Sequence, residues 1–409
     1  MSDKSSFKKV LFISYDGLTD PLGQSQILPY LIGLSNLGHS IHILSCEKKE
    51  NFELNFNQVN EKVKSSQLSW TYTFYSNRPP IISTVFIIQK MKTLALKIAR
   101  KQQTEIIHCR SLIPAMIGSS IKKKQGGKLV FDIRGFWADE RIEGGIWNYN
   151  NPLFRIIYNF FKSKEKHLFE NSDYIISLTE NAKNFIAANF KTKGNFQVIP
   201  CSVDLNHFNP NQLDDKLIAS LKLKFNFLPG DFVLTYVGSL GTRYLLKEML
   251  LFFKSLKQQK KEAKFLFITK SNTNEIESIC KEHTIDFSSI IITSCDYKEI
   301  PNYIAIGNAS IFFIVTSFTG KAVSPTKQSE VMSLGLPIVS NSGLGDTDKI
   351  LEATNTGIVV KEFNKAAYEV AAKKLLQFNR SKNEIREVAV QYFSLDAAIE
   401  KYREVYAQL

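Results

Sequence analysis

KVLFISYDGLTDPLGQSQILPYLIGLSNLGHSIHIL, residues 9–44, places two short apolar runs on either side of a polar loop and an amphipathic stretch. The apolar runs, Lys9–Ser14 and Ser40–Leu44, have the length and the β-branched content of buried strands. The stretch between them predicts a helix over Gly23–Leu37. A strand, a helix and a second strand in this order are typical of a parallel sheet with a helical crossover. The chain therefore begins as an α/β domain.

The same alternation occurs in two series along the 409 residues. The first series continues with strands at Ile106–Cys109, Lys128–Asp132 and Tyr174–Ser177 and helices at Val85–Lys101, Leu153–Phe169 and Asn181–Asn189. A polar stretch at 204–230 predicts a linker containing one short helix. The second series has strands at Phe232–Val237, Lys264–Ile268, Ser289–Thr293, Ser310–Ile314, Pro337–Ser340 and Gly357–Val360. We expect two Rossmann-like, doubly wound α/β domains, residues 1–208 and 209–392, facing each other across a cleft, with ligands at the carboxyl ends of the strands.

Composition narrows the class of protein. Hydrophobic residues at 44% and charged residues at 22% exclude a disordered chain and a coiled-coil rod. The 52 Lys and Arg against 39 Asp and Glu leave a charge of +13, which indicates nucleic acid, an anionic membrane or phosphorylated substrates as partners. Five scattered cysteines form no metal or disulfide pattern, and no apolar run is long enough to span a bilayer. These features predict a cytoplasmic protein.

Several catalytic signatures are missing from the sequence. The chain has no G-x-G-x-x-G after a strand, no G-x-x-x-x-G-K-[ST] and no G-x-S-x-G, so it lacks the fingerprints of NAD dehydrogenases, P-loop NTPases and α/β hydrolases. Asp346-Thr347-Asp348 matches the D-x-D motif of metal-dependent glycosyltransferases. Asp and Thr are also favoured at helix starts, and we favour that interpretation and assign no metal.

Two loops of the first domain carry candidate binding residues. In the loop after the first strand, Gly23 would let a ligand approach the backbone, with Gln24 beside it, although a plain connecting loop is equally consistent. In Asp132–Arg141, Arg134 could clamp a phosphate, and Asp139 or Glu140 could accept sugar hydroxyls. The alternative for this segment is a structural network of arginines and carboxylates. We expect His108 to be structural.

Two loops of the second domain have the features of a diphosphate site. Gly238, Ser239 and Arg243 lie between the first strand and a helix, so backbone donors and positive charge would gather at a helix start. Further along, Ser324 is expected to cap a helix whose free N–H groups belong to Thr326 and Lys327. Lys327 and Glu330 would share one helix face, although a simple surface ion pair has the same spacing.

A basic amphipathic stretch at Gln89–Lys101 suits the surface of an anionic membrane. An ordinary helix that covers the sheet and exposes its lysines has the same pattern.

Taken together, several segments resemble the retaining nucleotide-sugar glycosyltransferases of family 4, which have the GT-B architecture. They are LSNLGHSIHIL (34–44), SLTENAKNFI (177–186), VIPCSVDLNHF (198–208), YVGSL (236–240) and SPTKQSEVMSLGLPIV (324–339). FDIRGFWADERIEGG (131–145) further resembles a subgroup of bacterial surface-polysaccharide enzymes.

The resemblance assigns roles to residues. In the second domain Gly238, Ser239 and Arg243 would lie near the donor diphosphate, Ser324, Thr326 and Lys327 would hold phosphate, and Glu330 would bind ribose hydroxyls. The acceptor would occupy the first domain, with Gly23 at the loop closest to the donor, and we expect Gln24, Asp139 and Glu140 to lie on the acceptor side as well. A terminal helix at about 393–409 would pack back on that domain. Arg243, Lys327 and Arg134 would carry the catalysis.

Two positions depart from the family pattern. The first Glu of the E-x7-E motif would stand eight residues before Glu330, where this chain has Ala322. The family's frequent histidine after LVFDI (129–133) is replaced by Arg134. What that Glu does for the sugar must therefore come from another group or be absent. With Arg134 in place of the His, a contact with a sugar hydroxyl or the leaving group would be charged instead of neutral.

The expected function is transfer of a hexose, with retention, from a UDP- or GDP-sugar to a lipid-linked or glycan acceptor in lipopolysaccharide or capsule synthesis. No cofactor or metal is expected, and nucleic acid is not an expected partner. The enzyme would be cytoplasmic or peripheral on the inner face of the cell membrane. The alternatives are a sugar-nucleotide epimerase on the same fold and a non-catalytic polyanion-binding module.

Overall fold

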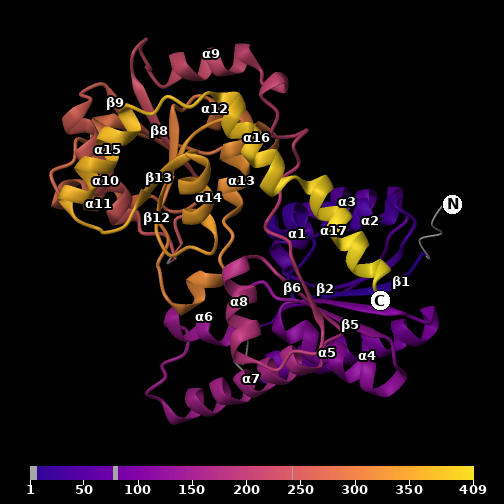
Figure 1. Cartoon of the computed structure of the whole chain (residues 1–409). Coiled ribbons are helices and arrows are strands. Elements are labelled where there is room, and N and C mark those ends of the chain that lie inside the picture. Colours follow the sequence, from indigo (N-terminus) through magenta and orange to yellow (C-terminus); the bar gives the residue numbers. More distant parts are fainter. Residues whose placement is uncertain (1–6, 77–81, 242) are drawn as a thin grey trace. The chain divides into compact units, whose positions relative to one another are not determined.

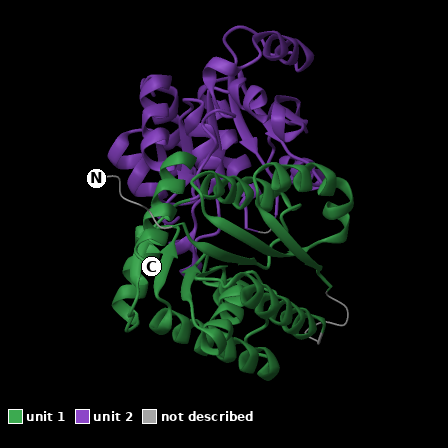
Figure 2. Cartoon of the chain, turned by 90° about the vertical axis from the view of Figure 1, so that its right-hand side faces the viewer, with its two compact units in different colours: residues 1–200, 395–409 green, residues 201–394 purple. Residues whose placement is uncertain are grey.

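The computed structural model describes residues 7–76, 82–241 and 243–409. The chain forms two compact units, residues 1–200 with 395–409 and residues 201–394, coloured separately in Figure 2. The predicted boundary after residue 208 lies eight residues too late. The reason is that the loop after Pro200 is bonded to the second unit, where the Val203 N–H donates to the Phe393 carbonyl and the Phe208 ring lies in the core.

Unit 1 is a seven-stranded parallel sheet with strand order β3-β2-β1-β4-β5-β6-β7. Its strands are β1 (Lys9–Ser14), β2 (Ser40–Glu47), β3 (Ser69–Phe74), β4 (Ile106–Arg110), β5 (Lys128–Asp132), β6 (Tyr174–Ser177) and β7 (Asn195–Val198). Its helices are α1 (Pro21–Gln26), α2 (Leu28–Asn36), α3 (Lys49–Ser65), α4 (Ile82–Gln102), α5 (Leu112–Gln125), α6 (Trp137–Glu143), α7 (Pro152–Asn171), α8 (Glu180–Asn189) and α17 (Leu395–Ala407). The central strands are buried along nearly their whole length, as expected where helices cover both faces.

Unit 2 is a six-stranded parallel sheet with strand order β10-β9-β8-β11-β12-β13. Its strands are β8 (Phe232–Val237), β9 (Ala263–Ile268), β10 (Ile290–Thr293), β11 (Ala309–Phe312), β12 (Ile338–Asn341) and β13 (Gly357–Val360). Its α-helices are α9 (Asp215–Lys224), α10 (Leu246–Gln259), α11 (Asn274–Glu282), α12 (Ile300–Ala305), α13 (Thr326–Ser333), α14 (Thr347–Thr354), α15 (Lys365–Leu376) and α16 (Lys382–Phe393). Short 3-10 turns lie at Pro210–Gln212, Phe287–Ser289, Tyr297–Glu299 and Phe318–Ala322. Helix α9 is the short helix expected in the linker.

Helix α17 returns to unit 1 after the whole of unit 2 has been completed. It packs on α2, as Figure 1 shows, and buries Ala398, Tyr402 and Tyr406 in the core of unit 1. Two of its side chains reach buried polar groups of the sheet. The Tyr402 hydroxyl donates to Asp132 Oδ2 (3.2 Å), and the Tyr406 hydroxyl lies 2.7 Å from His108 Nδ1. The terminal helix therefore belongs to unit 1 both by packing and by hydrogen bonding.

The strand orders locate the places where ligands are expected. In each sheet the order reverses beside the first strand, between β1 and β4 in unit 1 and between β8 and β11 in unit 2. The crevice outside the carboxyl ends of two such strands is the usual ligand site of an open α/β sheet. The loops after these four strands therefore define the candidate site of each unit.

Candidate functional site

In unit 2 the loop after β8 is hydrogen-bonded to the segment that follows β11. The Leu245 N–H donates to the Phe313 carbonyl, and the Val315 N–H donates to the Arg243 carbonyl, both at 2.9 Å. Arg243 is thus fixed beside the strand that follows the reversal, and its guanidinium lies 3.5 Å from Thr319 Oγ1. Thr242, which precedes it in the loop, lies outside the described residues. A role of Arg243 at a phosphate stays a prediction.

Lys327 is the buried cation of this loop cluster. It is 8% exposed, and its Nζ donates to the Tyr244 hydroxyl at 3.0 Å while lying 4.2 Å from the centre of that ring. A Cβ on Gly238 would stand only 2.5 Å from the same Nζ, so the ammonium lies directly against the backbone at Gly238. Gly238 has a φ of +113°, which L side chains rarely adopt, so conformation and space both favour glycine there.

Helix α13 directs its first turn to this cluster. The first N–H groups of a helix have no partner within it and carry its positive dipole end, which suits an anion. Thr326 is the first residue of the helix and Lys327 the second. A buried ammonium, a glycine backbone and a helix start therefore come together at the carboxyl end of β8, as a diphosphate site requires.

The expected cap of α13 is wrong by one residue. Pro325 occupies the cap position, and no side chain caps the helix there. The Ser324 hydroxyl instead accepts the Cys201 N–H at 3.1 Å and so holds the segment at residue 201 to the start of α13. Ser324 positions the helix through this bond.

Glu330 lies one turn further along α13. Burial raises the pKa of its carboxyl to about 7, and the Lys327 ammonium offsets part of that rise. Sequence reasoning missed its neighbour Tyr297. Burial, followed by the charge of Glu330, raises the pKa of the Tyr297 phenol well above its ordinary value, and the His207 ring stacks on Tyr297 at 4.7 Å. His207 lies in the quoted segment at 198–208, but nothing in the sequence shows that it meets Tyr297.

No carboxylate occupies the position of the missing first Glu. Ala322 is the last residue of a 3-10 turn, and its methyl group is buried. Ser239, in contrast, lies in the loop beside Gly238, where its carbonyl accepts the Tyr236 hydroxyl. The buried Tyr236 thus fixes the backbone of this loop through a hydrogen bond.

In unit 1 the reversal point holds charged side chains at the ends of β1, β4 and β5. Arg110 is buried, and its Nε lies 3.5 Å from Asp16 Oδ2. Arg134 Nη1 lies 3.5 Å from Asp132 Oδ1. Burial would raise the pKa of Asp132, but Arg134 and then His108 and Arg110 outweigh it and hold that pKa well below its usual range. Arg134 is therefore part of a structural Arg–carboxylate network, the alternative considered for this segment.

The four residues expected on the acceptor side occupy two different settings. Gly23 is buried, and a Cβ there would stand 2.0 Å from the Gly17 carbonyl, so this glycine lets α1 pack on its own preceding loop. Gln24 Nε2 donates to the Thr19 carbonyl at 3.1 Å. Both residues shape the loop after β1.

Asp139 and Glu140 lie on α6, at the end of β5. Asp139 accepts the Tyr158 hydroxyl at 2.8 Å and the Lys162 ammonium at 2.7 Å, so its carboxylate ties α6 to α7. The Glu140 carboxylate lies where a side chain on Gly135 would stand. The structure thus brings the two residues together with α7, and a contact with an acceptor remains a prediction.

Two family descriptions match the chain, one for each unit. "Glycosyltransferase Family 4" matches residues 30–207, and "Glycosyl transferases group 1" matches residues 220–391. Together the two matches support a GT-B glycosyltransferase. The second description covers Gly238, Arg243, Lys327 and Glu330.

A curated relative supports this assignment, and two solved structures share the fold. The uncharacterized glycosyltransferase MJ1069 of Methanocaldococcus jannaschii is 22% identical over 263 residues, and the match spans 62% of this chain and 63% of that protein's length. A glycosyltransferase from Rickettsia africae has a TM-score of 0.73 at 16% identity, with 98% of both chains covered. Anabaena Alr3699/HepE, solved with UDP and glucose, has a TM-score of 0.71 at 12% identity over 98% of this chain and all of that one. The structural likenesses establish the GT-B fold.

The helix expected to bind a membrane is buried on its apolar side. In α4, Ile87, Met91 and Ala95 are buried and the helix packs against the sheet and α5, whereas Val85 and Phe86 near its start are exposed. Association of residues 89–101 with a membrane surface stays a prediction. Among the described residues no helix is both long and apolar enough to cross a membrane.

The Asp346-Thr347-Asp348 motif begins a helix, as expected. Asp346 is the residue before α14, and Asp348 Oδ2 accepts the Gly343 N–H at 3.0 Å. Within the described parts of the glycosyltransferase, no group of three or more His, Cys, Asp or Glu side chains is placed to hold a metal ion.

Proposed function

We propose that this chain transfers a hexose, with retention, from a UDP- or GDP-sugar to a lipid-linked or glycan acceptor in the synthesis of a surface polysaccharide. The observation that carries the proposal is the position of the Lys327 ammonium, buried against Gly238 at the start of α13. Burial makes a cation costly unless an anion or other polar groups compensate it. A diphosphate bound at the helix start would supply that compensation.

The proposed chemistry relies on charge stabilisation. When the bond between the sugar and the diphosphate breaks, negative charge develops on the leaving group, and donors fixed in advance at that point lower the barrier. Lys327, Arg243 and the first N–H groups of α13 would act in this way. Because these groups supply positive charge themselves, we propose that turnover needs no divalent metal.

The uridine nucleotide has support from a structural neighbour, since Alr3699/HepE was solved with UDP and glucose. In our proposal Glu330 accepts the ribose hydroxyls, and the stacked rings of Tyr297 and His207 lie close to that position. The acceptor would bind unit 1 at the carboxyl ends of β1, β4 and β5.

The deciding experiment is calorimetric titration of the full chain with UDP, GDP, ADP and CMP, with and without EDTA. We expect one diphosphate to bind selectively and EDTA to leave the affinity unchanged. Sugars of the best nucleotide would then be tested for transfer, with the anomeric configuration of the product read by NMR. Absence of binding for all four nucleotides would refute the donor site, and conversion of the donor without an acceptor would indicate an epimerase.

An enzyme with a lipid-linked acceptor must reach a membrane surface. Unit 1 has an exposed apolar surface that could make this contact. The segment 146–160 exposes a row of apolar side chains, which we call the α7 ridge: Ile146, Tyr149, Leu153, Ile156 and Phe160. Arg155, Lys164 and Lys166 lie exposed on the same helix, and Lys164 Nζ is 5.3 Å from the Phe160 ring. Apolar side chains flanked by basic ones suit an anionic membrane surface. We therefore propose peripheral membrane association through this ridge.

A further inference from the structure

Glu47 is a fully buried carboxylate that the proposed donor chemistry does not use. It ends β2, and its side chain is 0% exposed. A buried carboxylate is costly unless it is well hydrogen-bonded, so the identity of its donors indicates what it is there to hold.

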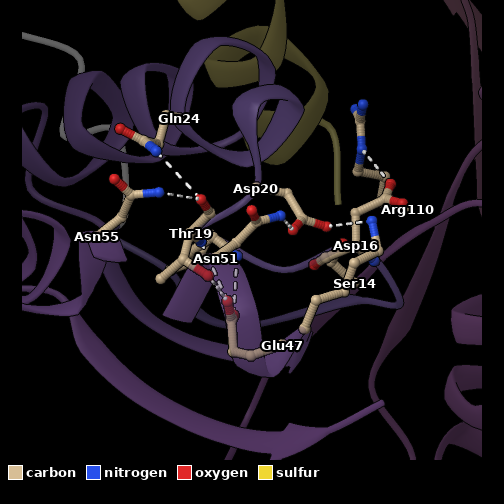
Figure 3. A network of polar contacts seen from close by, with 11 residues as sticks. Ser14, Asp16, Thr19, Asp20, Gln24, Glu47, Asn51, Asn55 and Arg110 are labelled. Carbon is tan, nitrogen blue, oxygen red and sulfur yellow. Dashed lines mark hydrogen bonds and ion pairs between the residues drawn. The ribbon is translucent and has the colours of Figure 1, made fainter. Parts of the chain in front are cut away.

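Most of the donors to Glu47 come from the loop between β1 and α1. The Leu18 N–H donates to Oε1 at 2.8 Å, and the Thr19 N–H and hydroxyl donate to Oε2 at 3.1 and 2.5 Å. The Ser45 hydroxyl, from β2 itself, donates to Oε1 at 2.5 Å. Figure 3 shows the carboxylate below Thr19, with the loop passing over it. Hydrogen bonds to an ionised acceptor are about twice as strong as neutral ones, so this loop is firmly held.

The loop passes close to Glu47 at Gly17, where a larger side chain would have to displace the carboxylate. A Cβ on Gly17 would stand 2.5 Å from Glu47 Oε2. The far side of the loop is bonded to α3 and to the residue before it. Asp20 accepts Lys48 Nζ at 2.9 Å and Asn51 Nδ2 at 2.5 Å, and Asn55 Nδ2 donates to the Thr19 carbonyl at 3.1 Å. Residues 17–20 are thus fixed from β2 and α3.

What this fixed loop presents at the reversal point is Asp16. Its backbone N–H donates to Ser14 Oγ at 3.0 Å, and its carboxylate is 48% exposed and lies 3.5 Å from Arg110 Nε. Gln24, at the start of the next helix, is bonded to the Thr19 carbonyl. A shift of the loop would therefore displace both Asp16 and Gln24.

We propose that Glu47 is a positioning residue for acceptor binding, which acts by fixing the loop 15–20 so that Asp16 and Gln24 meet the acceptor. The inference rests on the proposed function, because it assumes that unit 1 binds the acceptor. Glu47 itself is buried under the loop and need not touch the substrate. Misplacement of binding groups by about 1 Å can cost about a hundredfold in rate, so such a residue has a measurable effect.

The test compares Glu47→Gln with Glu53→Gln, which changes an exposed glutamate on α3. The glutamine amide presents N–H donors where the carboxylate accepted bonds. We expect Glu47→Gln to raise the KM for octyl glycosides, used as acceptor probes, by about tenfold or more, while affinity for the nucleotide stays within about twofold. Glu53→Gln should leave both unchanged. Thr19→Val, which removes one donor and keeps the carboxylate, should reproduce the KM effect in weaker form.

Hydrogen exchange provides a second measurement that does not need turnover. The amides of Leu18 and Thr19 should exchange faster in Glu47→Gln and at the wild-type rate in Glu53→Gln. If the wild type transfers no sugar, the proposed function fails, and unchanged exchange at these amides would overturn the positioning role as well. If the wild type is active and Glu47→Gln keeps the wild-type acceptor KM, the inference is overturned while the proposed function stands.

Discussion

The surroundings of Lys327 favour the phosphate-binding role proposed for this residue. Its ammonium is buried against the Gly238 backbone, and the Tyr244 hydroxyl accepts its hydrogen bond. Sequence spacing alone also allowed a surface pair with Glu330, and burial is the observation that separates the two interpretations. A surface lysine would have gained a few tenths of a kcal/mol from its partner, whereas a buried one needs an anion.

We expect Lys327→Ala to weaken nucleoside diphosphate binding by about tenfold to a hundredfold, because a hydrogen bond to a charged group contributes about 1.5–3 kcal/mol. Calorimetric titration would measure the change. Lys373→Ala, an exposed lysine on α15, is the matched control and should bind as the wild type does. Equal affinity in all three proteins would remove the phosphate role from Lys327.

If Glu330 contacts the nucleotide as proposed, its raised pKa predicts that nucleotide binding depends on pH. Its folded-state pKa of about 7 is above its ordinary value, so its contribution to the free energy of unfolding is full below about pH 4.5 and is lost as pH rises toward 7. Ribose hydroxyls would donate to the ionised form. We expect nucleotide affinity to rise with pH through 7, by about tenfold for each unit by which binding lowers this pKa. Calorimetry from pH 5.5 to 8.5 would measure it.

Glu330→Gln serves as the control for that experiment, since the phosphate groups of the nucleotide also titrate. The glutamine variant should lose the part of the pH dependence that belongs to the carboxyl. A pH profile identical to that of the wild type would show that Glu330 does not contact the nucleotide.

Arg134 sits in a structural network, yet it lies at the end of β5 where the acceptor is proposed to bind. We expect Arg134→Ala to lower turnover by about tenfold and to leave donor affinity unchanged, because the residue belongs to unit 1. Steady-state kinetics together with calorimetry would separate the two effects. Arg100→Ala, exposed at the end of α4, is the comparison. Full activity in Arg134→Ala would leave this arginine with a structural role alone.

At the scale of elements, the sequence predicts most of the strands and fewer of the helices. Lys9–Ser14, Lys128–Asp132, Tyr174–Ser177 and Phe232–Val237 have the predicted bounds, because buried parallel strands are apolar without interruption. The helix expected over Gly23–Leu37 is instead two helices that meet at Ile27. Pro29, in the first turn of α2, explains the break, since it has no N–H to donate to the carbonyl four residues earlier and its ring clashes with that carbonyl.

Helix α3 was missed because it lacks a clear apolar pattern, whereas strand β3 was missed although Trp70, Tyr72 and Phe74 alternate with threonines as in a strand. Helix α3 buries only Val59 and Val63 along its length, so its periodicity is weak. Strand β3 lies at the sheet edge and is mostly exposed. In the site, the sequence placed Gly238, Arg243, Lys327 and Glu330 on two loops. The contacts of Tyr244, Tyr297 and Glu47 depend on residues far apart in the chain, and no local spacing shows them.

Helix α17 makes a prediction at this scale. Tyr402→Phe and Tyr406→Phe each remove a hydroxyl from a buried polar group, Asp132 or His108, which should cost about 1–3 kcal/mol of the free energy of unfolding. Urea unfolding would measure it. Tyr392→Phe, an exposed tyrosine on α16, should cost nothing measurable. Losses no larger than that of the control would show that these two hydroxyls contribute nothing to stability.

For the whole molecule, the charge of +13 and the α7 ridge together predict where the protein is found after mixing with lipid. We expect sedimentation with vesicles of anionic phosphatidylglycerol, weaker binding to phosphatidylcholine, and release by salt, since the Debye length shrinks to about 3 Å at 1 M. Ile156→Ser with Phe160→Ser should lower binding. Leu54→Ser, an exposed leucine on α3, is the matched control. Equal binding by these variants would exclude the ridge as the contact surface.

The return of α17 to unit 1 also fixes an order of events during protein synthesis. Unit 2 is an insertion within unit 1, so the ribosome completes all of residues 201–394 before it makes the helix that reaches Asp132 and His108. Until unit 2 has been translated, Asp132 and His108 of the nascent unit 1 lack the hydroxyl groups of Tyr402 and Tyr406. A nonsense codon just before α17 would leave unit 2 intact and unit 1 unfinished, and cellular proteases would meet the unfinished unit first.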